Sequence, residues 1–237
     1  MEFVNALVEA RLIKRYKRFL ADVQLGDGSV ITVHCPNTGS MKRCQQESAR
    51  VWISKSGNLK RKYAYTWELV EVDQTHLACI NTGLPNKLVK EAIDLGIIQE
   101  LQGYDFHKSE VKYGGNSRID WLLSSSKDMK ENLCFVEVKN VTLLEEDGRG
   151  YFPDAITERG KKHLYELASM VNQGHRAVLL FCASHTGIDD VRPASSIDPS
   201  YAEALKEVVA LGVEVIAYKA EINEKDIKIV QKIDVFL

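Results

Sequence analysis

The sequence lacks the features of several common protein classes. It contains five cysteines, which are scattered, odd in number and without a CxxC pair, so neither a disulfide framework nor a structural zinc site is expected. No apolar run reaches about 18 residues, and the N-terminus lacks the basic, apolar and small-residue order of a secretory signal. We therefore expect a cytoplasmic protein.

Several catalytic and nucleotide-binding motifs are also missing. The sequence contains no P-loop, no GxGxxG, no GxSxG nucleophile elbow and no HExxH. The common nucleotide-binding, serine-hydrolase and zinc-protease classes are therefore not indicated.

The net charge of −2 is small, but the charges are unevenly distributed. Residues 1–65 carry 12 Lys plus Arg against 5 Asp plus Glu, whereas the remaining residues carry 19 against 28. A basic first part beside an acidic remainder predicts that the first part faces an anion.

The first 82 residues favour short strands and turns. Two runs of alternating apolar residues flank Gly26-Asp27-Gly28, which is typical of a β-hairpin. Further strands are expected within residues 50–54, 57–73 and 76–81. About five strands with little helical periodicity predict a small closed barrel, such as an OB-fold, as the first domain.

Residues 83–237 have a different pattern and are expected to form a second domain. A helix with Pro85 at its start precedes three strand candidates, and the clearest helix of the chain follows, ending at Gly174. Strand, helix and strand come next. This order predicts a mixed sheet with flanking helices, so the fold class is α/β within an α+β chain.

The strand "LCFVEVKN" carries the most informative charges. Side chains alternate along a strand, so Glu137 and Lys139 share one face while Val136 and Val138 face the other. If this strand pairs with the preceding "RIDWLL" as a hairpin, Asp120 comes opposite the region of Glu137. Two carboxylates and an ammonium would then converge, although E-x-K on a solvent face is also common.

This arrangement suits metal-assisted chemistry. Carboxylate oxygens are typical ligands of Mg²⁺, and Mn²⁺ is a second candidate. Such an ion activates water and neutralises phosphodiester charge, while Lys139 could position the water or stabilise negative charge. Glu91, on the preceding helix, could add a catalytic acid if the rotation of that helix allows it.

The chain as a whole resembles a known family. Asp120 with Glu137-Val138-Lys139 is similar to the core of the PD-(D/E)XK nuclease superfamily, with "RID" where a Pro-Asp would stand. More closely, the chain resembles the sugar fermentation stimulation protein A (SfsA) family. The motifs that carry this resemblance are "CPNTGSM" (35–41), "RKYAYTWELV" (61–70), "NTGLPNKLVKEAI" (81–93), "RIDW" (118–121), "FVEVKNVTL" (135–143), "GYFPDAITERGKKHL" (150–164) and "IDPSYAEAL" (197–205).

The resemblance implies an OB-like N-terminal domain and a nuclease-like C-terminal domain. It makes Asp120 and Glu137 metal ligands and Lys139 the catalytic lysine. It also implies DNA binding without strong sequence preference and a regulatory role in sugar (maltose) metabolism.

The helix after "YFPDA" contributes further candidates. Asp154 could cap this helix or lie near its positive end. Arg159 and His163 share a face at i and i+4, and Glu158 lies nearby, so these three residues could bind phosphate beside the metal site. A solvated helix face is the alternative interpretation.

Basic residues interleaved with aromatic residues indicate nucleic-acid binding by the barrel, because OB-folds combine positive grooves with aromatic platforms. An ordinary basic surface over an aromatic core would give the same pattern. The candidates are Arg11, Lys14, Arg15, Lys17, Arg18, Lys60, Arg61 and Lys62.

Two functions remain open. The first is a metal-dependent nuclease, and the second is a non-catalytic DNA-binding regulator. DNA is the expected partner, and RNA stays open.

Overall fold

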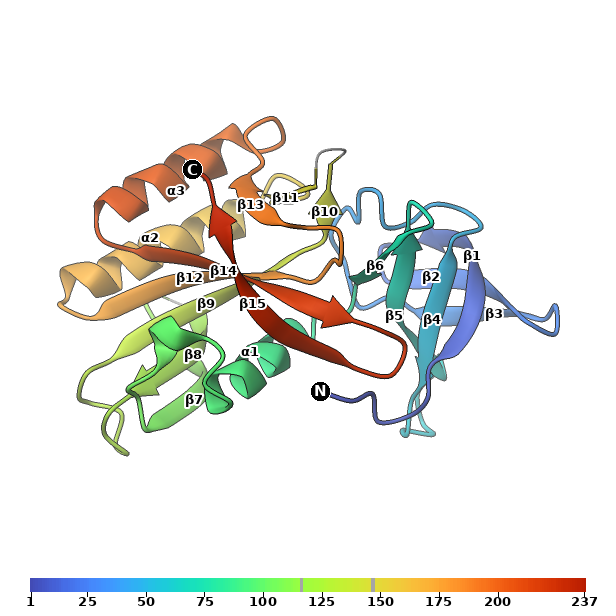
Figure 1. Ribbon diagram of the computed structural model, residues 1–237, viewed down its shortest axis with the longest axis horizontal. Coiled ribbons are helices and arrows are strands. Elements are labelled where there is room, and N and C mark those ends of the chain that lie inside the picture. Colours follow the sequence, from blue (N-terminus) through green and yellow to red (C-terminus); the bar gives the residue numbers. More distant parts are fainter. Residues whose placement is uncertain (116, 146–147) are drawn as a thin grey trace.

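The computed structural model describes residues 1–115, 117–145 and 148–237, and it shows a β-barrel followed by a mixed sheet with helices (Figure 1). The first six strands are arranged in the order β3-β2-β1-β4-β5-β6, and β3 also pairs with β5, which closes five strands into a barrel. These strands are β1 (Val8–Tyr16), β2 (Leu20–Leu25), β3 (Val30–His34), β4 (Arg50–Lys55), β5 (Tyr65–Val72) and β6 (His76–Cys79). The expected OB-like barrel is confirmed.

Sequence patterns located most of these strands but not β1. The hairpin around Gly26-Asp27-Gly28 joins β2 and β3 as expected. In β1, only Ala10 and Leu12 are buried, and the register then shifts between Leu12 and Lys14. A bulge breaks the alternation on which strand recognition depends, so this segment read only as a basic stretch.

Three loops lie together at one end of the barrel. Tyr16 pairs with Leu20, Leu20 pairs with His34, and His34 pairs with Thr66. The β1–β2 turn, the segment after β3 and the loop before β5 are therefore neighbours. This end of the barrel faces the junction with the second domain, because the segment after β3 makes contacts there that are described below.

The C-terminal domain contains a mixed sheet. Within the described residues its strands are arranged in the order β10-β11-β13-β15-β14-β12-β9-β8-β7. Its elements are α1 (Pro85–Asp94), the 3₁₀ helix η1 (Gln99–Leu101), β7 (Phe106–Tyr113), β8 (Ser117–Ser124), β9 (Cys134–Val141), β10 (Leu143–Leu144), β11 (Arg149–Phe152), α2 (Glu158–Asn172), β12 (Arg176–Ala183), β13 (Asp190–Pro193), α3 (Pro199–Ala210), β14 (Glu214–Ile222) and β15 (Ile227–Val235). The expected mixed sheet with flanking helices is confirmed.

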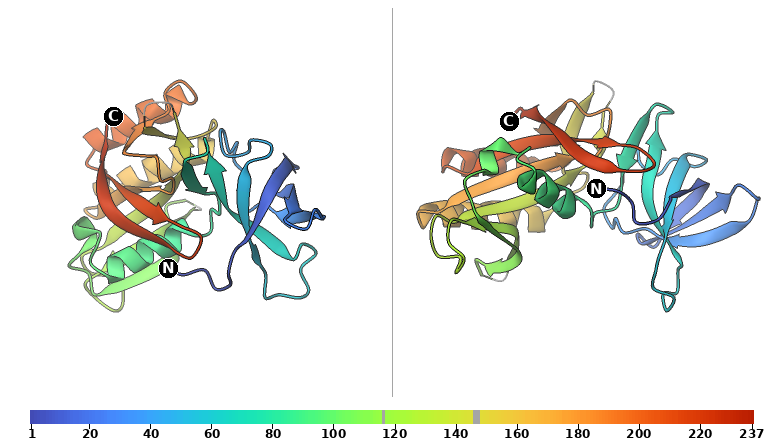
Figure 2. Two further views of the ribbon diagram at one scale, coloured as in Figure 1. Left: turned by 45° about the vertical axis from the view of Figure 1, so that its right-hand side comes forward. Right: turned by 60° about the horizontal axis from the view of Figure 1, so that its bottom comes forward.

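Helices cover both faces of this sheet (Figures 1 and 2). α2 and α3 pack on one face, where Leu164 of α2 is buried against Phe181. α1 packs on the other, where Val136 and Val138 of β9 are buried with Leu88. The prediction that the two valines share one face of β9 is therefore confirmed, and the opposite face of β9 is directed toward α2.

Two short parallel strands were not expected. β11 and β13 pair in parallel, with Gly150 beside Val191. A Cβ on Gly150 would lie 2.7 Å from the side chain of Ile188, so only glycine fits there. The two strands have four residues each and lie about 40 residues apart in the sequence, so no local pattern predicts their pairing. From the sequence alone, the first of them is interpreted as a loop.

The two domains are joined by direct hydrogen bonds. Ser40, after β3, donates through Oγ to the backbone oxygen of Asp154 at 2.7 Å, and the Met41 backbone N donates to Asp154 Oδ2 at 2.9 Å. Of the two roles expected for Asp154, the one in which it caps α2 is wrong. Thr157 is the N-cap instead, because its side chain accepts from the backbone N of Gly160 at 3.0 Å.

All five cysteines are buried and unpaired. Within the described residues, no helix combines the length and the apolar character that a membrane crossing requires.

Candidate functional site

Asp120 lies where β8 and β9 separate. The antiparallel ladder ends at the pair of Trp121 and Val136. One residue further along the same register, Asp120 comes opposite Glu137, as the sequence predicted. The carboxylate replaces the missing ladder acceptor, since Asp120 Oδ2 accepts from the backbone N of Val138 at 2.7 Å.

The start of α1 holds the other oxygen of this carboxylate. Asn86 Nδ2 donates to Asp120 Oδ1 at 2.7 Å. In return, Trp121 Nε1 donates to the backbone oxygen of Asn86 at 3.1 Å. Both oxygens of Asp120 are therefore fixed by residues from two different elements.

Glu137 is 3% exposed, and its Oε1 receives two donors. Lys139 Nζ donates at 2.6 Å, and His163 Nδ1 donates to the same oxygen. Arg159 Nε donates to His163 Nε2 at 3.4 Å, which assigns the proton of the neutral ring to Nδ1. The predicted common face of Glu137 and Lys139 is confirmed, and α2 adds Arg159 and His163 to it.

The two carboxylates ionise differently. Burial, followed by the charge of Glu137, raises the pKa of Asp120. Burial also acts to raise the pKa of Glu137, but the hydrogen bond from His163 and the charge of Lys139 outweigh it, so this pKa is lowered. Glu137 is therefore the more firmly anionic group.

Several buried polar atoms beside this pair lack hydrogen-bond partners among the described residues. They are Glu137 Oε2, both carboxylate oxygens of Glu166, and the hydroxyls of Tyr113 and Tyr201. The only ion pair of Glu166 in the described part is with Lys162, 3.6 Å away. Burial and the charge of Glu137 raise the pKa of both tyrosines. Unpartnered buried polar atoms are uncommon in proteins and call for an explanation.

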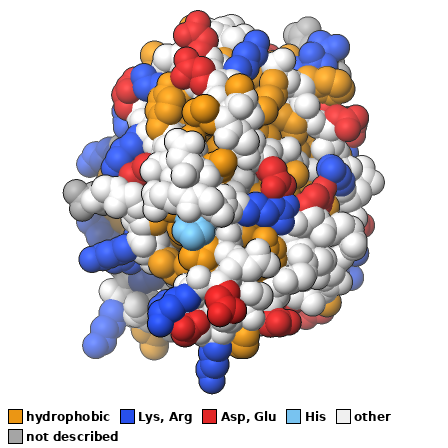
Figure 3. Space-filling view, turned by 90° about the vertical axis from the view of Figure 1, so that its left-hand side faces the viewer, with side chains coloured by type: hydrophobic (Ala, Val, Ile, Leu, Met, Phe, Trp, Pro, Cys, Tyr) orange, Lys and Arg blue, Asp and Glu red, His pale blue; other side chains and the backbone are white. Residues whose placement is uncertain are grey.

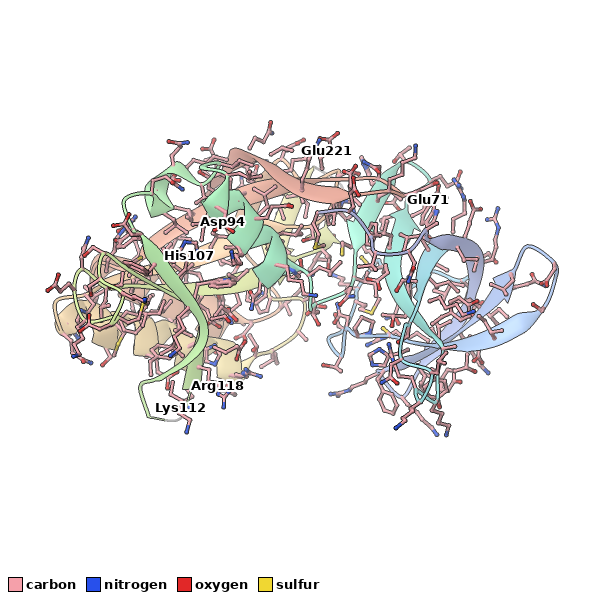
Figure 4. All side chains as sticks on the ribbon, turned by 90° about the horizontal axis from the view of Figure 1, so that it is seen from below. Glu71, Asp94, His107, Lys112, Arg118 and Glu221 are labelled. Carbon is pink, nitrogen blue, oxygen red and sulfur yellow. The ribbon has the colours of Figure 1, made fainter. Side chains whose placement is uncertain are left out.

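An open groove of about 530 Å³ exposes the site to solvent. It is lined by Glu110, Ser117, Arg118, Asp120, Glu137, Glu158, Arg159, Lys162 and His163. Arg118 lies beside Lys112 at one end of the β7–β8 hairpin (Figure 4). In the described residues, no group of three or more His, Cys, Asp or Glu is arranged to hold a metal ion. Four of the groove's lining side chains are carboxylates, among them the paired Asp120 and Glu137, and three are Lys or Arg.

Glu91 does not belong to this site. Its Oε2 accepts from the N-terminal amine of Met1 at 2.7 Å, and it lines neither the groove nor the neighbouring cavity. Asn86 of the same helix points at Asp120, and five residues of α-helix turn the side chain by about 140°. The predicted catalytic role of Glu91 is therefore wrong, because helix rotation directs it elsewhere.

The basic residues of the barrel form two groups. Lys17 and Arg18 in the β1–β2 turn share the junction end with the loop that carries Lys60, Arg61 and Lys62. Arg61 NH1 donates to Thr66 Oγ1 at 3.1 Å, which ties that loop to β5.

The other three basic residues have local partners. Arg15 NH2 donates to the backbone oxygens of Arg18, Asn37 and Gly39, so it organises the loop after β3 instead of facing solvent. Arg11 lines a different pocket, which also contains Glu47, Glu71 and Asp73. Lys14 lies 3.9 Å from Asp22.

Charge on the far end of the molecule is mixed. Figure 3 shows the end of the C-terminal domain away from the barrel, where acidic and basic side chains are interspersed with hydrophobic ones.

Sequence reasoning missed Asn86, Glu110, Arg118 and Lys162 as site residues. The sequence could have identified Arg118, since it precedes Asp120 by two positions and therefore shares its face of β8. Glu110 has φ of 56°, a conformation unusual for a non-glycine residue, and its two neighbours in β7 pair with the two residues that flank Asp120 in β8. No sequence signal predicts that conformation.

Fold and site together define a class: an OB barrel joined to a mixed-sheet domain with a split hairpin that carries two acidic residues and a lysine. Comparisons with known proteins agree. Residues 13–80 match the family described as SfsA N-terminal OB domain, and residues 83–226 match the sugar fermentation stimulation protein RE domain. The chain belongs to the SfsA family.

Relatives cover the chain almost completely. A sugar fermentation stimulation protein homolog from Marinomonas sp. is 62% identical over 237 residues, covering all of this chain and 91% of that protein. A homolog from Hahella chejuensis is 55% identical and covers 95% of this chain and 92% of its own. The structure of Pyrococcus furiosus SfsA in complex with Ca²⁺ matches with a TM-score of 0.88 and 27% identity, covering 100% and 98% of the two chains.

Proposed function

We propose that this protein is a divalent-metal-dependent nuclease that binds nucleic acid, DNA first of all, without strong sequence preference. The observation that carries the proposal is the pair of Asp120 and Glu137 with Lys139, brought together at a split hairpin beside a groove whose lining includes three Lys or Arg side chains. This is the donor set expected for hydrolysis of a phosphodiester. A cytoplasmic location, where thiols stay reduced, suits the five unpaired cysteines.

The residues fit Mg²⁺ or Mn²⁺. Both ions accept carboxylate oxygens, and Mg²⁺ usually takes only one or two carboxylates together with waters and substrate phosphates. Glu137 Oε2 is buried without a partner in the described residues, so an acceptor oxygen is available. Asp120 and Glu137 would hold the ion, which when bound would supply an activated water and neutralise phosphate charge. The Ca²⁺ of the Pyrococcus furiosus structure supports a divalent cation in this family.

The chain's own residues would position the reactants. Arg118, Arg159 and Lys162 on the groove rim would attract the phosphate backbone. Lys139 would stabilise negative charge on the phosphorus oxygens. His163, held in one tautomer by Arg159, keeps Glu137 ionised and oriented.

The test is a cleavage assay on labelled single- and double-stranded DNA and RNA with Mg²⁺, Mn²⁺ or EDTA. We expect cleavage that requires metal and is lost in Asp120→Asn. Lys127→Gln, a surface change outside the groove, is the matched purification control and should cleave like the wild type. Cleavage of equal rate in Asp120→Asn would show a contaminating nuclease.

A second candidate is a non-catalytic DNA-binding protein that regulates sugar (maltose) metabolism genes. The supporting observation is that Lys139 already forms an ion pair with Glu137 Oε1, to which His163 adds a hydrogen bond, so the acid is charge-paired without a metal. Binding of DNA without cleavage of any of the four substrates under every metal condition would favour it.

A further inference from the structure

A second cavity lies on the other side of Asp120, between the two domains. It measures about 270 Å³, below the roughly 300–1,000 Å³ of pockets for drug-sized ligands. Asp120 lines both this cavity and the groove, and Lys139 lines the cavity as well. A nucleic-acid strand with a phosphate bound at Asp120 and Glu137 would therefore have a neighbouring part next to the cavity.

Neutral amide and hydroxyl groups dominate the polar lining. The side chains that matter are Asn37 from the barrel, Thr82 before α1, Asn86 in α1, and Asn140 and Thr142 near the end of β9. The amides place a donor and an acceptor in one plane, which is how Asn reads base edges, and the hydroxyls can either donate or accept. The walls of the cavity come from both domains.

One of these amides has an unused acceptor. Asn140 Oδ1 is buried and has no hydrogen-bond partner among the described residues. Its Nδ2 donates to the backbone oxygen of Cys79 over a long distance, 3.4 Å. A buried carbonyl without a donor costs free energy unless a ligand supplies one, so Asn140 is suited to a ligand with an N–H group.

Tyr151 offers an aromatic surface to the same cavity. On β11, Phe152 packs against Phe181 and Gly150 approaches Ile188, both in the core beneath α2 and α3. Alternation along the strand turns Tyr151 to the opposite side, toward the barrel. Its ring is partly exposed and makes no ring contact within the described part of the chain.

Charge argues against a second phosphate as the ligand. Asp120 and Asp154 line the cavity, and Lys139 is the single cation among the described residues of its lining. An anion would meet two carboxylates, whereas a neutral ring system would meet amides and a tyrosine. The lining therefore selects an uncharged, planar, hydrogen-bonding group.

We propose that this interdomain cavity binds a nucleobase next to the phosphate that lies at Asp120 and Glu137, with the base stacked on Tyr151 and hydrogen-bonded to Asn140. The inference rests on the proposed function, since it takes nucleic acid as the ligand. It names the substrate class more narrowly: the base must be unpaired, so the substrate is a single strand or an unpaired nucleotide in a duplex.

The test measures binding in EDTA, so that cleavage plays no part. Dye-labelled twelve-residue strands of dA, dC or dT, a fully abasic strand and a blunt duplex are titrated by fluorescence polarisation. Loss of one stacked base weakens binding about 5-fold or more, which is the effect expected for Tyr151→Ala on at least one base-containing strand. The abasic strand and the duplex should bind Tyr151→Ala and wild type within about 2-fold of each other.

Three further variants separate binding from structure. Tyr151→Phe should restore affinity, because stacking needs the ring and not the hydroxyl. Tyr165→Ala removes an exposed tyrosine that bonds Glu207 on the outer helices and should change nothing. Asn140→Leu should weaken binding of base-containing strands while leaving Tm unchanged or raised, because it removes an unpartnered buried acceptor.

The inference and the proposed function can fail separately. The base site is overturned if Tyr151→Ala weakens binding of the abasic strand and of the base-containing strands equally. It is also overturned if the variant weakens binding of neither. Both outcomes hold even where metal-dependent cleavage is found. If the base-dependent loss appears but no substrate is ever cleaved, the base site stands and the nuclease proposal fails.

Discussion

Two buried glutamates, one in each domain, show how differently the domains use charge. Glu68 in the barrel is 5% exposed, and Glu137 in the mixed sheet is 3% exposed. Both oxygens of Glu68 are satisfied by neutral donors, Ser54 Oγ and Asn81 Nδ2, each at 2.6 Å. Glu137 has a lysine and a histidine on one oxygen and no partner in the described residues on the other.

The same contrast holds across the two domains. Among the described residues, the buried polar atoms without partners lie in the mixed-sheet domain, with Arg15 Nε as the barrel's exception. Native proteins satisfy buried polar groups except where another role competes. The buried polar groups of the barrel are therefore almost all used within the protein, whereas the mixed-sheet domain has buried acceptors that a ligand could use.

The largest expected effect is on turnover. Glu137→Gln should reduce metal-dependent cleavage by about 100- to 1000-fold, the range for removing one electrostatic contributor to a transition state. Glu68→Gln should instead lower stability by about 1–2 kcal/mol, because two hydrogen bonds to a charged acceptor are replaced by weaker bonds made by a neutral amide. Its turnover per folded molecule should be unchanged, and an equal loss in both variants would remove the distinction between the two glutamates.

Metal binding gives the second effect. With metal at about 100 times its Kd, a ligand that binds only the folded state stabilises it by about 2.7 kcal/mol. We expect Mg²⁺ or Mn²⁺ to raise the Tm of wild type and of Glu68→Gln in a calorimetric scan, but not that of Glu137→Gln. A Tm increase that survives in Glu137→Gln would place the metal elsewhere.

Much of this architecture was predictable from local patterns. The alternation of side chains along β9 predicted that Glu137 and Lys139 share a face. The loop between β8 and β9 indicated a hairpin, which places Asp120 opposite Glu137. Pro85 and Gly174 correctly marked the start of α1 and the region where α2 ends. These features depend on neighbours within about 20 residues, which a sequence records directly.

Features that depend on distant segments were not predictable. The direction of Glu91 is set by the rotation of α1 against the sheet, and Asp154 is held by a loop from the barrel more than 100 residues earlier. Arg15 looked like a surface cation, but its partners are backbone oxygens of a folded loop. Neither the spacing nor the composition of a sequence records such contacts.

Acid should weaken the junction between the two regions. The ring of His185, buried after β12, lies 5.6 Å from that of His76 of β6 and is tilted against it. Burial, together with the charge of His76, lowers the pKa of His185 to about 4. The unfolded chain binds this proton near pH 6.5 and the folded chain only near pH 4. The stabilising contribution is therefore present above pH 6.5 and is lost as pH falls from 6.5 toward 4.

The variant His185→Asn isolates this contribution. Asn can still accept from the backbone N of Gly187, as His185 Nδ1 does at 3.0 Å, but it does not titrate. In urea titrations from pH 8 to pH 4, the stability of wild type relative to the variant should fall below pH 6.5 by at most about 1.4 kcal/mol per pH unit. Parallel curves over this range would contradict the prediction.

The smallest effect concerns the cations at the junction end of the barrel. If Lys17 and Arg18 contact phosphates, the double variant Lys17→Gln with Arg18→Gln should weaken single-strand binding on every sequence. It should also reduce the slope of log K against log salt by about 0.7 for each lost contact. Lys127→Gln with Lys130→Gln, which removes two cations from the loop between β8 and β9, is the matched control and should leave the slope unchanged. Equal slopes for both double variants would mean that nucleic acid does not pass this end of the barrel, and the groove beside Asp120 would then have to bind it through the mixed-sheet domain alone.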